Sequence, residues 1–199
     1  AASDVYKRQH EIDVENKTTM FNDKVKIPLK PFPGIMGVAP DTEEMLSTIP
    51  PRANGGNMDD PSLVEGTTVY FPVFVKGALF SIGDGHAVQG YGEVCGSAIE
   101  APMTFTYRVR VIKDKPAIKE PQYETDDYYA VTGFGETIDI ATKKAVNYMI
   151  DHLSNNYDIS EEDAYMLCSL AGDLKIAEVV DVPNMLVTMH FPKSILKQL

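Results

Sequence analysis

The residue pair best suited to chemistry is Asp84 and His86, which stand two positions apart in the sequence GDGH. In an extended segment, alternate side chains project to the same face, so a carboxylate and an imidazole would lie side by side. Such a pair suits a divalent metal ion, or a histidine that the aspartate orients for proton transfer. Asp-Gly also occurs in plain hairpin turns, where a histidine would only cap a loop. The spacing leaves these alternatives open and fixes no metal.

The segment around this pair, residues 83–100, is dense in glycine and in polar side chains. Glycine has no Cβ, so the backbone can approach a bound molecule closely. Gln89, Glu93 and Glu100 add one amide and two carboxylates, which are groups that bind water, a metal ion or an amide. The sequence therefore indicates a candidate site within this segment.

Two further features outside the metal pair are candidates for function. Asn57 and Asp59 follow two glycines on a loop, where an Asx-turn explains them as simply as a binding role does. Cys95 is a possible nucleophile, but a reactive thiol needs positive surroundings, and Glu93 and Glu100 flank this one. We expect Cys95 to be a small buried residue on a strand.

The composition excludes several classes of partner. The chain has 199 residues and a formal net charge of −11, so it would repel the phosphate backbone of a nucleic acid. No apolar run approaches the length of a membrane span. Two cysteines are too few for a disulfide framework and indicate reduced thiols in a cytoplasmic protein. A small neutral substrate is compatible with this charge, and we expect a homo-oligomer.

The elements that must position these residues change character along the chain. Residues 10–60 are rich in proline and glycine turns, which interrupt helices and central strands, so we predict a loop across a scaffold. Later segments are β-branched and aromatic, and apolar side chains alternate with polar ones in a pattern typical of strands. The predicted strands cover residues 67–82, 103–112, 128–132, 174–180 and 184–190.

Two amphipathic helices are predicted late in the chain. Apolar residues recur every three to four positions within 136–153. The stripe expected to be buried consists of Ile138, Ala141, Ala145, Met149 and Leu153. A second helix over 161–171 has Ser160 as its N-cap, Gly172 as a left-handed C-cap and Cys168 in its core-facing side. The order of elements predicts an α+β fold: a β-rich core, barrel- or sandwich-like, with a late helical hairpin and a C-terminal β-hairpin.

Several long segments together carry a resemblance to a known family: NGGNMDD, YFPVFVKGALFS, GDGHAVQGYGEVCGSAIE, IPLKPFPGIMGVAP and EEDAYMLCSLAGDLKIAEVVDVPNMLV. They closely resemble the acetamidase/formamidase family of short-chain amide hydrolases over about residues 10–195. Members of that family are longer at the N-terminus. The resemblance therefore implies that residues 10–199 are the C-terminal part of such an enzyme, and residues 1–9 are expected to be a non-native leader.

The resemblance also implies a set of site residues. The matched positions are Asn57, Asp59, Asp84, His86, Gln89, Glu93 and Glu100. One position departs from the pattern, because this chain has Tyr91 where the family commonly has aspartate within QGDGE. A tyrosine has an unperturbed pKa of about 10 and cannot replace a carboxylate as a ligand or as a base at neutral pH.

The activity that the resemblance implies is hydrolysis of a small linear amide, such as formamide or acetamide, to a carboxylate and ammonia. A neutral amide is a poor electrophile, and a divalent ion overcomes this by polarising the carbonyl and activating water. We expect zinc, with Asp84 and His86 as its ligands. Glu93 or Glu100 is expected to move protons. The residues expected to bind the amide are Asn57, Asp59 and Gln89.

Two alternatives to this activity stay open. A catalytically inactive fragment could keep the fold and bind a small ligand in the glycine-lined segment without turnover. A metal-free amidase could instead use Cys95 as an acylated nucleophile. Metal content, and ammonia release before and after chelation, would separate the three.

Overall fold

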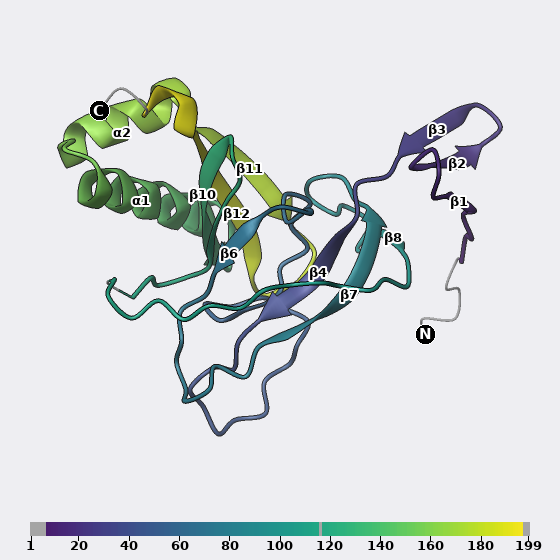
Figure 1. The fold of residues 1–199 in the computed structure, drawn as a ribbon, viewed down its shortest axis with the longest axis horizontal. Helices are drawn as coiled ribbons and strands as arrows, with labels where there is room; N and C mark the ends of the chain where they lie inside the picture. Colours follow the sequence, from purple (N-terminus) through teal and green to yellow (C-terminus); the bar gives the residue numbers. More distant parts are fainter. Residues whose placement is uncertain (1–6, 116, 197–199) are drawn as a thin grey trace.

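The computed structural model describes residues 7–115 and 117–196, which form three antiparallel sheets and two α-helices (Figure 1). Most of the expected non-native leader, residues 1–6, lies outside the described residues. The smallest sheet contains β1 (Ile12–Asp13), β2 (Thr18–Asn22) and β3 (Val25–Pro28). It projects away from the rest of the molecule in Figure 1.

The two larger sheets build the body of the molecule. One has the order β5 (Gly55–Asn57), β4 (Phe32–Gly37), β7 (Ser81–Val88), β8 (Ile99–Glu100). The other has the order β11 (Asp173–Glu178), β12 (Met185–Pro192), β10 (Tyr128–Gly135), β9 (Gln122–Glu124), β6 (Thr68–Tyr70). A short 3₁₀ turn, η1 (Lys193–Ile195), follows β12.

Helices α1 (Ile138–Asn156) and α2 (Glu161–Ala171) pack together on one face of the five-stranded sheet (Figure 1). Each helix begins where a hydroxyl side chain satisfies a free backbone N–H: Thr137 accepts from Ile140, and Ser160 accepts from Asp163. In the described part of the chain, neither helix combines the length and the apolar character that a membrane span requires. The late helical hairpin and the C-terminal β-hairpin of β11 and β12 are thus confirmed, as is the α+β fold class.

The core lies on both faces of β10. Val131 packs with the buried stripe of α1, whereas Ala130 and Phe134 face the opposite cluster, which includes Met58 and Tyr123. A strand covered on both faces needs a nearly continuous apolar run, and this is what the sequence supplies there. In this opposite cluster, residues of the five-stranded sheet pack against Met58 in the segment after β5. This contact brings the two larger sheets together.

One glycine decides how closely helix and sheet approach. A Cβ at Gly133 on β10 would lie 2.3 Å from the carbonyl oxygen of Ala141 and 2.7 Å from the amide nitrogen of Ala145. These distances are far below ordinary contact, so only glycine allows α1 to lie directly on the strand. Small residues at 141 and 145 complete the close approach.

The prediction of a strand over residues 103–112 is wrong. This segment carries no strand pairing among the described residues, and its apolar side chains from Tyr107 onward are exposed, with Val109 at 65% and Val111 at 73%. Alternation of apolar and polar residues gives a strand only when another strand lies alongside to pair with its backbone. The predicted strand over 67–82 is likewise shorter, because only β6 and the first residues of β7 are strand.

The prediction that residues 10–60 merely cross a scaffold is also wrong. This region supplies β4, which pairs with β5 on one side and with β7 on the other. Its Pro33 lies outside the part of β4 that pairs with β5, so the missing N–H can face an open side of the strand. A proline near the end of β4 is therefore compatible with a central position of this strand in its sheet.

Two details of the helices differ from expectation. Four of the five residues of the α1 stripe are fully buried, but Ile138, in the first turn, is 38% exposed because the helix starts beyond the edge of the core. Gly172 has a φ of −90° and is not a left-handed cap. A Cβ there would lie 2.2 Å from Met189 Cε, so this glycine serves close packing instead. Cys168 is buried as expected.

Candidate functional site

The candidate site is a cluster of carboxylates around the buried imidazole of His86. Nε2 of this histidine lies 3.2 Å from Glu100 Oε2, 3.3 Å from Asp84 Oδ2 and 3.7 Å from Asp59 Oδ1. His86 and Asp84 share one face of β7, and Glu100 is the residue paired with His86 on the neighbouring strand β8. Asp59 comes from the segment after β5. The structure thus brings the expected metal pair together with two further carboxylates.

The two remaining predicted residues with acid and amide groups lie beside this cluster. Glu93 offers a carboxylate oxygen within 4.8 Å of ligand atoms of His86 and Glu100, and within the same distance of Asp59 and Asp181. Asn57 donates from Nδ2 to Asp181 Oδ2 across 2.6 Å. Neither Asn57 nor Asp59 is therefore explained by an isolated Asx-turn, because their side chains point into one shared polar centre.

Gln89 determines the tautomer of His86. The amide nitrogen of Gln89 donates to the backbone carbonyl of Asp59 across 2.6 Å, and a carbonyl can only accept. Gln89 Oε1 therefore faces His86 Nδ1 at 2.8 Å, so Nδ1 carries the proton and donates it. In the neutral ring this leaves the lone pair of Nε2 facing three carboxylates. That arrangement is electrostatically unfavourable unless a proton or a metal ion lies between them.

Gly34 on β4 keeps the centre of the cluster open. A Cβ at this position would lie 2.4 Å from Asp59 Oδ1 and 2.8 Å from both Asp84 Oδ2 and His86 Cε1. Asp59 is 3% exposed, and its Oδ1 accepts no hydrogen bond from any described residue. A buried acceptor without a donor is costly. The donor set and the open centre therefore fit a divalent cation, which prefers nitrogen and carboxylate oxygen ligands.

Three of the acidic residues are held in an uncommon backbone conformation. Asp59, Asp84 and Glu93 have φ values of +41°, +56° and +43°. A non-glycine residue in the left-handed region costs on the order of 1 kcal/mol or more, so it persists only where the surroundings impose it. Such positions concentrate at functional sites, and here they aim the carboxylates toward a common point.

Burial and mutual repulsion both disfavour charge in the cluster. Burial, with Glu93 and Asp181 close by, raises the pKa of Asp59 to about 9. Burial, with nearby Asp181 and Glu100, raises the pKa of Glu93 to about 7. The pKa values of Glu100 and Asp181 are raised as well, mainly by burial. A bound cation would reverse this balance by favouring the charged forms.

Asp181, Glu178 and Gly34 are site residues that sequence reasoning missed. Glu178 is fully buried, and its Oε2 accepts from the backbone N–H groups of Val180 and Asp181, which holds the turn that presents Asp181. Asp181 meets Asn57 across 124 positions of sequence, so no local spacing could have indicated it.

Cys95 and Tyr91 lie outside the carboxylate cluster. Cys95 is exposed in a turn, so the prediction of a buried strand residue is wrong; the glycine-rich chain bends there before β8 begins. The hydroxyl of Tyr91 lies 2.8 Å from Ser62 Oγ and faces Lys175. The departure at Tyr91 thus removes no group from around His86.

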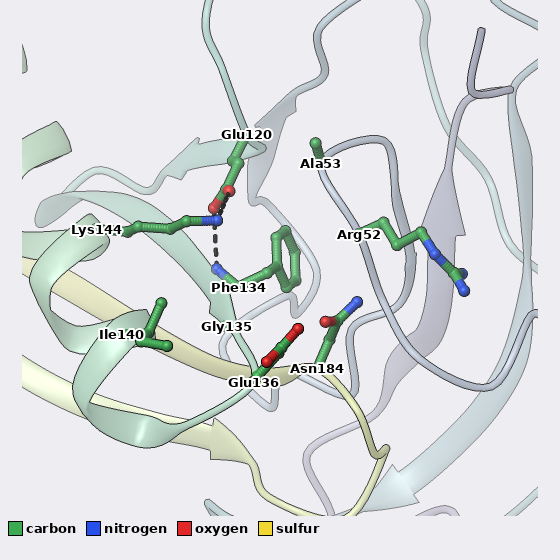
Figure 2. A pocket seen from close by; sticks show the side chains of 9 residues that line it. All are labelled: Arg52, Ala53, Glu120, Phe134, Gly135, Glu136, Ile140, Lys144 and Asn184. Atoms are coloured by element: carbon green, nitrogen blue, oxygen red, sulfur yellow. Dashed lines mark hydrogen bonds and ion pairs between the residues drawn. The ribbon is translucent and has the colours of Figure 1, made fainter. Parts of the chain in front are cut away.

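A separate cavity of about 470 Å³ lies at the start of α1 (Figure 2). Figure 2 shows Lys144 directed at Glu120, with Nζ 2.7 Å from Oε1, and Glu120 Oε2 accepts from the backbone N–H of Phe134. Its central charged groups are therefore already paired. None of the residues predicted from the sequence as site residues lines this cavity, so the cluster around His86 is the stronger candidate.

Known proteins resemble this chain in sequence. The model of the Acetamidase/Formamidase family matches residues 41–198. A formamidase of Methylophilus methylotrophus is 33% identical over 173 residues, which are 76% of this chain and 42% of that protein. A putative formamidase of Schizosaccharomyces pombe is 32% identical over 76% of this chain and 43% of its own length.

Solved structures give the same relationship. A predicted acetamidase/formamidase from Thermoanaerobacter tengcongensis matches with a TM-score of 0.82 and 35% identity, covering 94% of this chain and 61% of that one. An acetamidase from Yersinia enterocolitica matches with a TM-score of 0.84 and 28% identity, covering 96% of this chain and 56% of that one. The chain thus spans less than half the length of the two curated relatives described above. From its sequence and its fold, the chain belongs to the acetamidase/formamidase family.

Proposed function

We propose that the protein containing this chain hydrolyses a small linear amide, of the formamide or acetamide type, to a carboxylate and ammonia. The names of its relatives support an amidase, and the cluster around His86 supplies groups that suit the reaction. The observation that carries the proposal is the lone pair of His86 Nε2 directed at three carboxylates. The protein would be a cytoplasmic homo-oligomer.

In this proposal the cluster holds a divalent ion, with zinc as the first candidate. His86 and Asp84 would be ligands, and Asp59 and Glu100 offer the nearest additional oxygens. When bound, such an ion acts as a Lewis acid and lowers the pKa of water. Gln89 would orient the ring of His86 through Nδ1, the kind of hydrogen bond that metal-binding histidines usually make.

Glu93 is the best candidate for moving protons. Its carboxylate lies beside the cluster but is not one of the three that face His86 Nε2, so it is placed to accept a proton from a water molecule there. It would take a proton from the attacking water as the oxygen adds to the amide carbon. It would then return that proton to the amide nitrogen, so that the C–N bond breaks and ammonia leaves.

Asn57 is the best candidate for binding the amide. Its Nδ2 is occupied by Asp181, so its carbonyl oxygen is the group that can accept from the substrate NH₂. The sequence analysis expected Gln89 to bind the amide substrate. In the structure both the oxygen and the nitrogen of its side-chain amide already bind within the protein. We therefore assign Gln89 to positioning, and Asp59 to the cation, rather than to the substrate.

One alternative is a protein that keeps the fold and binds a small ligand in the carboxylate cluster without turnover. The metal-free alternative with Cys95 as nucleophile has less support, because the thiol is exposed and lies outside the cluster.

Metal content and ammonia release test the proposal. We expect about one equivalent of a divalent ion per cluster, and release from formamide or acetamide that stops on chelation and returns with zinc. His86→Ala should remove both metal and release while leaving the circular dichroism spectrum unchanged. Release that survives chelation and is lost in Cys95→Ser would support the metal-free alternative. Metal binding without release would support the non-catalytic one.

A further inference from the structure

A chain of buried polar groups approaches the carboxylate cluster from the five-stranded sheet and ends at Asp60. Asp60 and Tyr123 are 0% and 1% exposed. The hydroxyl of Tyr123 donates to Asp60 Oδ2 across 2.5 Å, and the backbone N–H of Ser62 donates to Oδ1 across 2.9 Å. Burying a carboxyl group is costly without such donors, so these bonds fix the position of Asp60.

His190 on β12 continues the chain behind Tyr123. Its Nε2 lies 3.0 Å from both the Tyr123 hydroxyl and Thr188 Oγ1, and its Nδ1 lies 3.4 Å from Lys175 Nζ. An ammonium group can only donate, so Nδ1 accepts and the ring proton is on Nε2. Burial lowers the pKa of His190 to about 3, which keeps the ring neutral. The Nε2 proton faces the hydroxyls of Tyr123 and Thr188, so a continuous series of polar contacts runs from Lys175 through His190 and Tyr123 to Asp60.

The end of this chain is one peptide bond from the cluster. Asp59, the residue before Asp60, is in the left-handed conformation with a φ of +41°. Its N–H donates to the carbonyl of Gly34 across 3.0 Å, and its carbonyl accepts from Gln89 across 2.6 Å. The first bond holds the N-terminal side of the strained residue. The second bond and the buried carboxyl of Asp60 hold its C-terminal side.

We propose that Tyr123 and His190 are positioning residues that lock Asp60 and thereby keep Asp59 in the strained conformation that points its carboxylate at His86. The inference deepens the proposed function and rests on it for its consequence, which is tighter binding of the cation. Asp60, Tyr123 and His190 contact neither the substrate nor the cation in this proposal. Their effect is transmitted through the backbone of Asp59.

The direct test is amide hydrogen exchange at Asp59 in the metal-free protein. Tyr123→Phe removes the hydroxyl that holds Asp60 and should raise the exchange rate at Asp59 at least tenfold relative to the amide of Ala145 in α1. Tyr129→Phe is the matched control, because it also removes a tyrosine hydroxyl with a 2.5 Å bond, here to Gln122 on β9. A loss of overall stability would raise exchange at Ala145 as well, so the ratio isolates positioning.

The second measurement is zinc affinity, determined by competition with a chelating dye at a temperature where every variant is folded. We expect Tyr123→Phe to bind Zn²⁺ at least tenfold more weakly than wild type, and Tyr129→Phe to bind it within twofold. His190→Leu should resemble Tyr123→Phe. His190→Gln keeps an N–H donor for Tyr123 and should recover most of the zinc affinity. If Tyr123→Phe does not fold, the comparison of His190→Leu with His190→Gln tests the positioning role instead.

The outcomes separate this inference from the proposed function. If the wild-type protein binds no zinc but the exchange ratio at Asp59 changes as expected, the positioning role stands and the metal-based function fails. An unchanged exchange ratio at Asp59 in Tyr123→Phe and His190→Leu would overturn the inference. So would wild-type zinc affinity in both variants, whatever the exchange ratio, because the positioning would then have no consequence for the cation.

Discussion

Gly34→Ala tests the candidate site without changing any of its chemical groups. Gly34 lies on β4 between the residues that pair with Gly85 and Gly83 of β7. Its substitution adds one methyl group at the point that Asp59, Asp84 and His86 surround. The substitution keeps every candidate ligand, so any loss of metal would come from geometry alone.

The size of the effect follows from the distances. The added Cβ would lie 2.4 Å from Asp59 Oδ1, whereas ordinary contact begins at 3.4 Å, so the carboxylate must retreat by about 1 Å. Metal–ligand distances tolerate deviations of only about 0.2 Å. We therefore expect zinc affinity to fall by about 100-fold, at the upper end of what disturbed ligand orientation produces. The preference for alanine over glycine in a strand, about 0.5–1 kcal/mol, opposes the cost of this overlap, so thermal stability should change less than zinc affinity.

Gly83→Ala is the matched control on the adjacent strand, since a Cβ there meets nothing within 4 Å. It should bind zinc with wild-type affinity in the same dye competition, with bound metal checked by elemental analysis. If Gly34→Ala also binds zinc within threefold of wild type, a cation does not occupy the space between Asp59 and His86, and our account of the cluster is wrong.

Three further predictions concern the helical half. Met149→Ala empties a fully buried position of α1 and should lower the free energy of unfolding in urea by about 2–5 kcal/mol; a change below 1 kcal/mol would contradict its place in the core. Ser160→Ala removes the bond to the Asp163 N–H and should cost about 1 kcal/mol, whereas Ser160→Asp, which keeps a cap, should cost little. Burial lowers the pKa of His152 to about 4, so the unfolded chain binds the extra proton below pH 6.5 and stability is lost as the pH falls toward 4. His152→Gln should remove up to about 3 kcal/mol of that loss; equal pH profiles would refute the shift.

The helices were predictable because their order is local. Most backbone groups of α1 and α2 bond within their own helix, so apolar periodicity and the cap at Ser160 carry most of the information. The pairing of Asp84 with His86 on one face was predictable for the same reason, since it follows from the two-residue period of a strand. The family resemblance added the other matched residues, again as contiguous motifs.

Tertiary structure decided everything that depends on a partner distant in sequence. Residues 103–112 have the pattern of a strand, yet no described strand pairs with them, whereas Pro33 lies in a strand with neighbours on both sides. Asp181 joins Asn57 across 124 positions, and Gly34 leaves a space that two other segments surround, the one carrying Asp59 and strand β7. Strand pairing and side-chain convergence depend on which distant segments meet, and no local pattern contains that information.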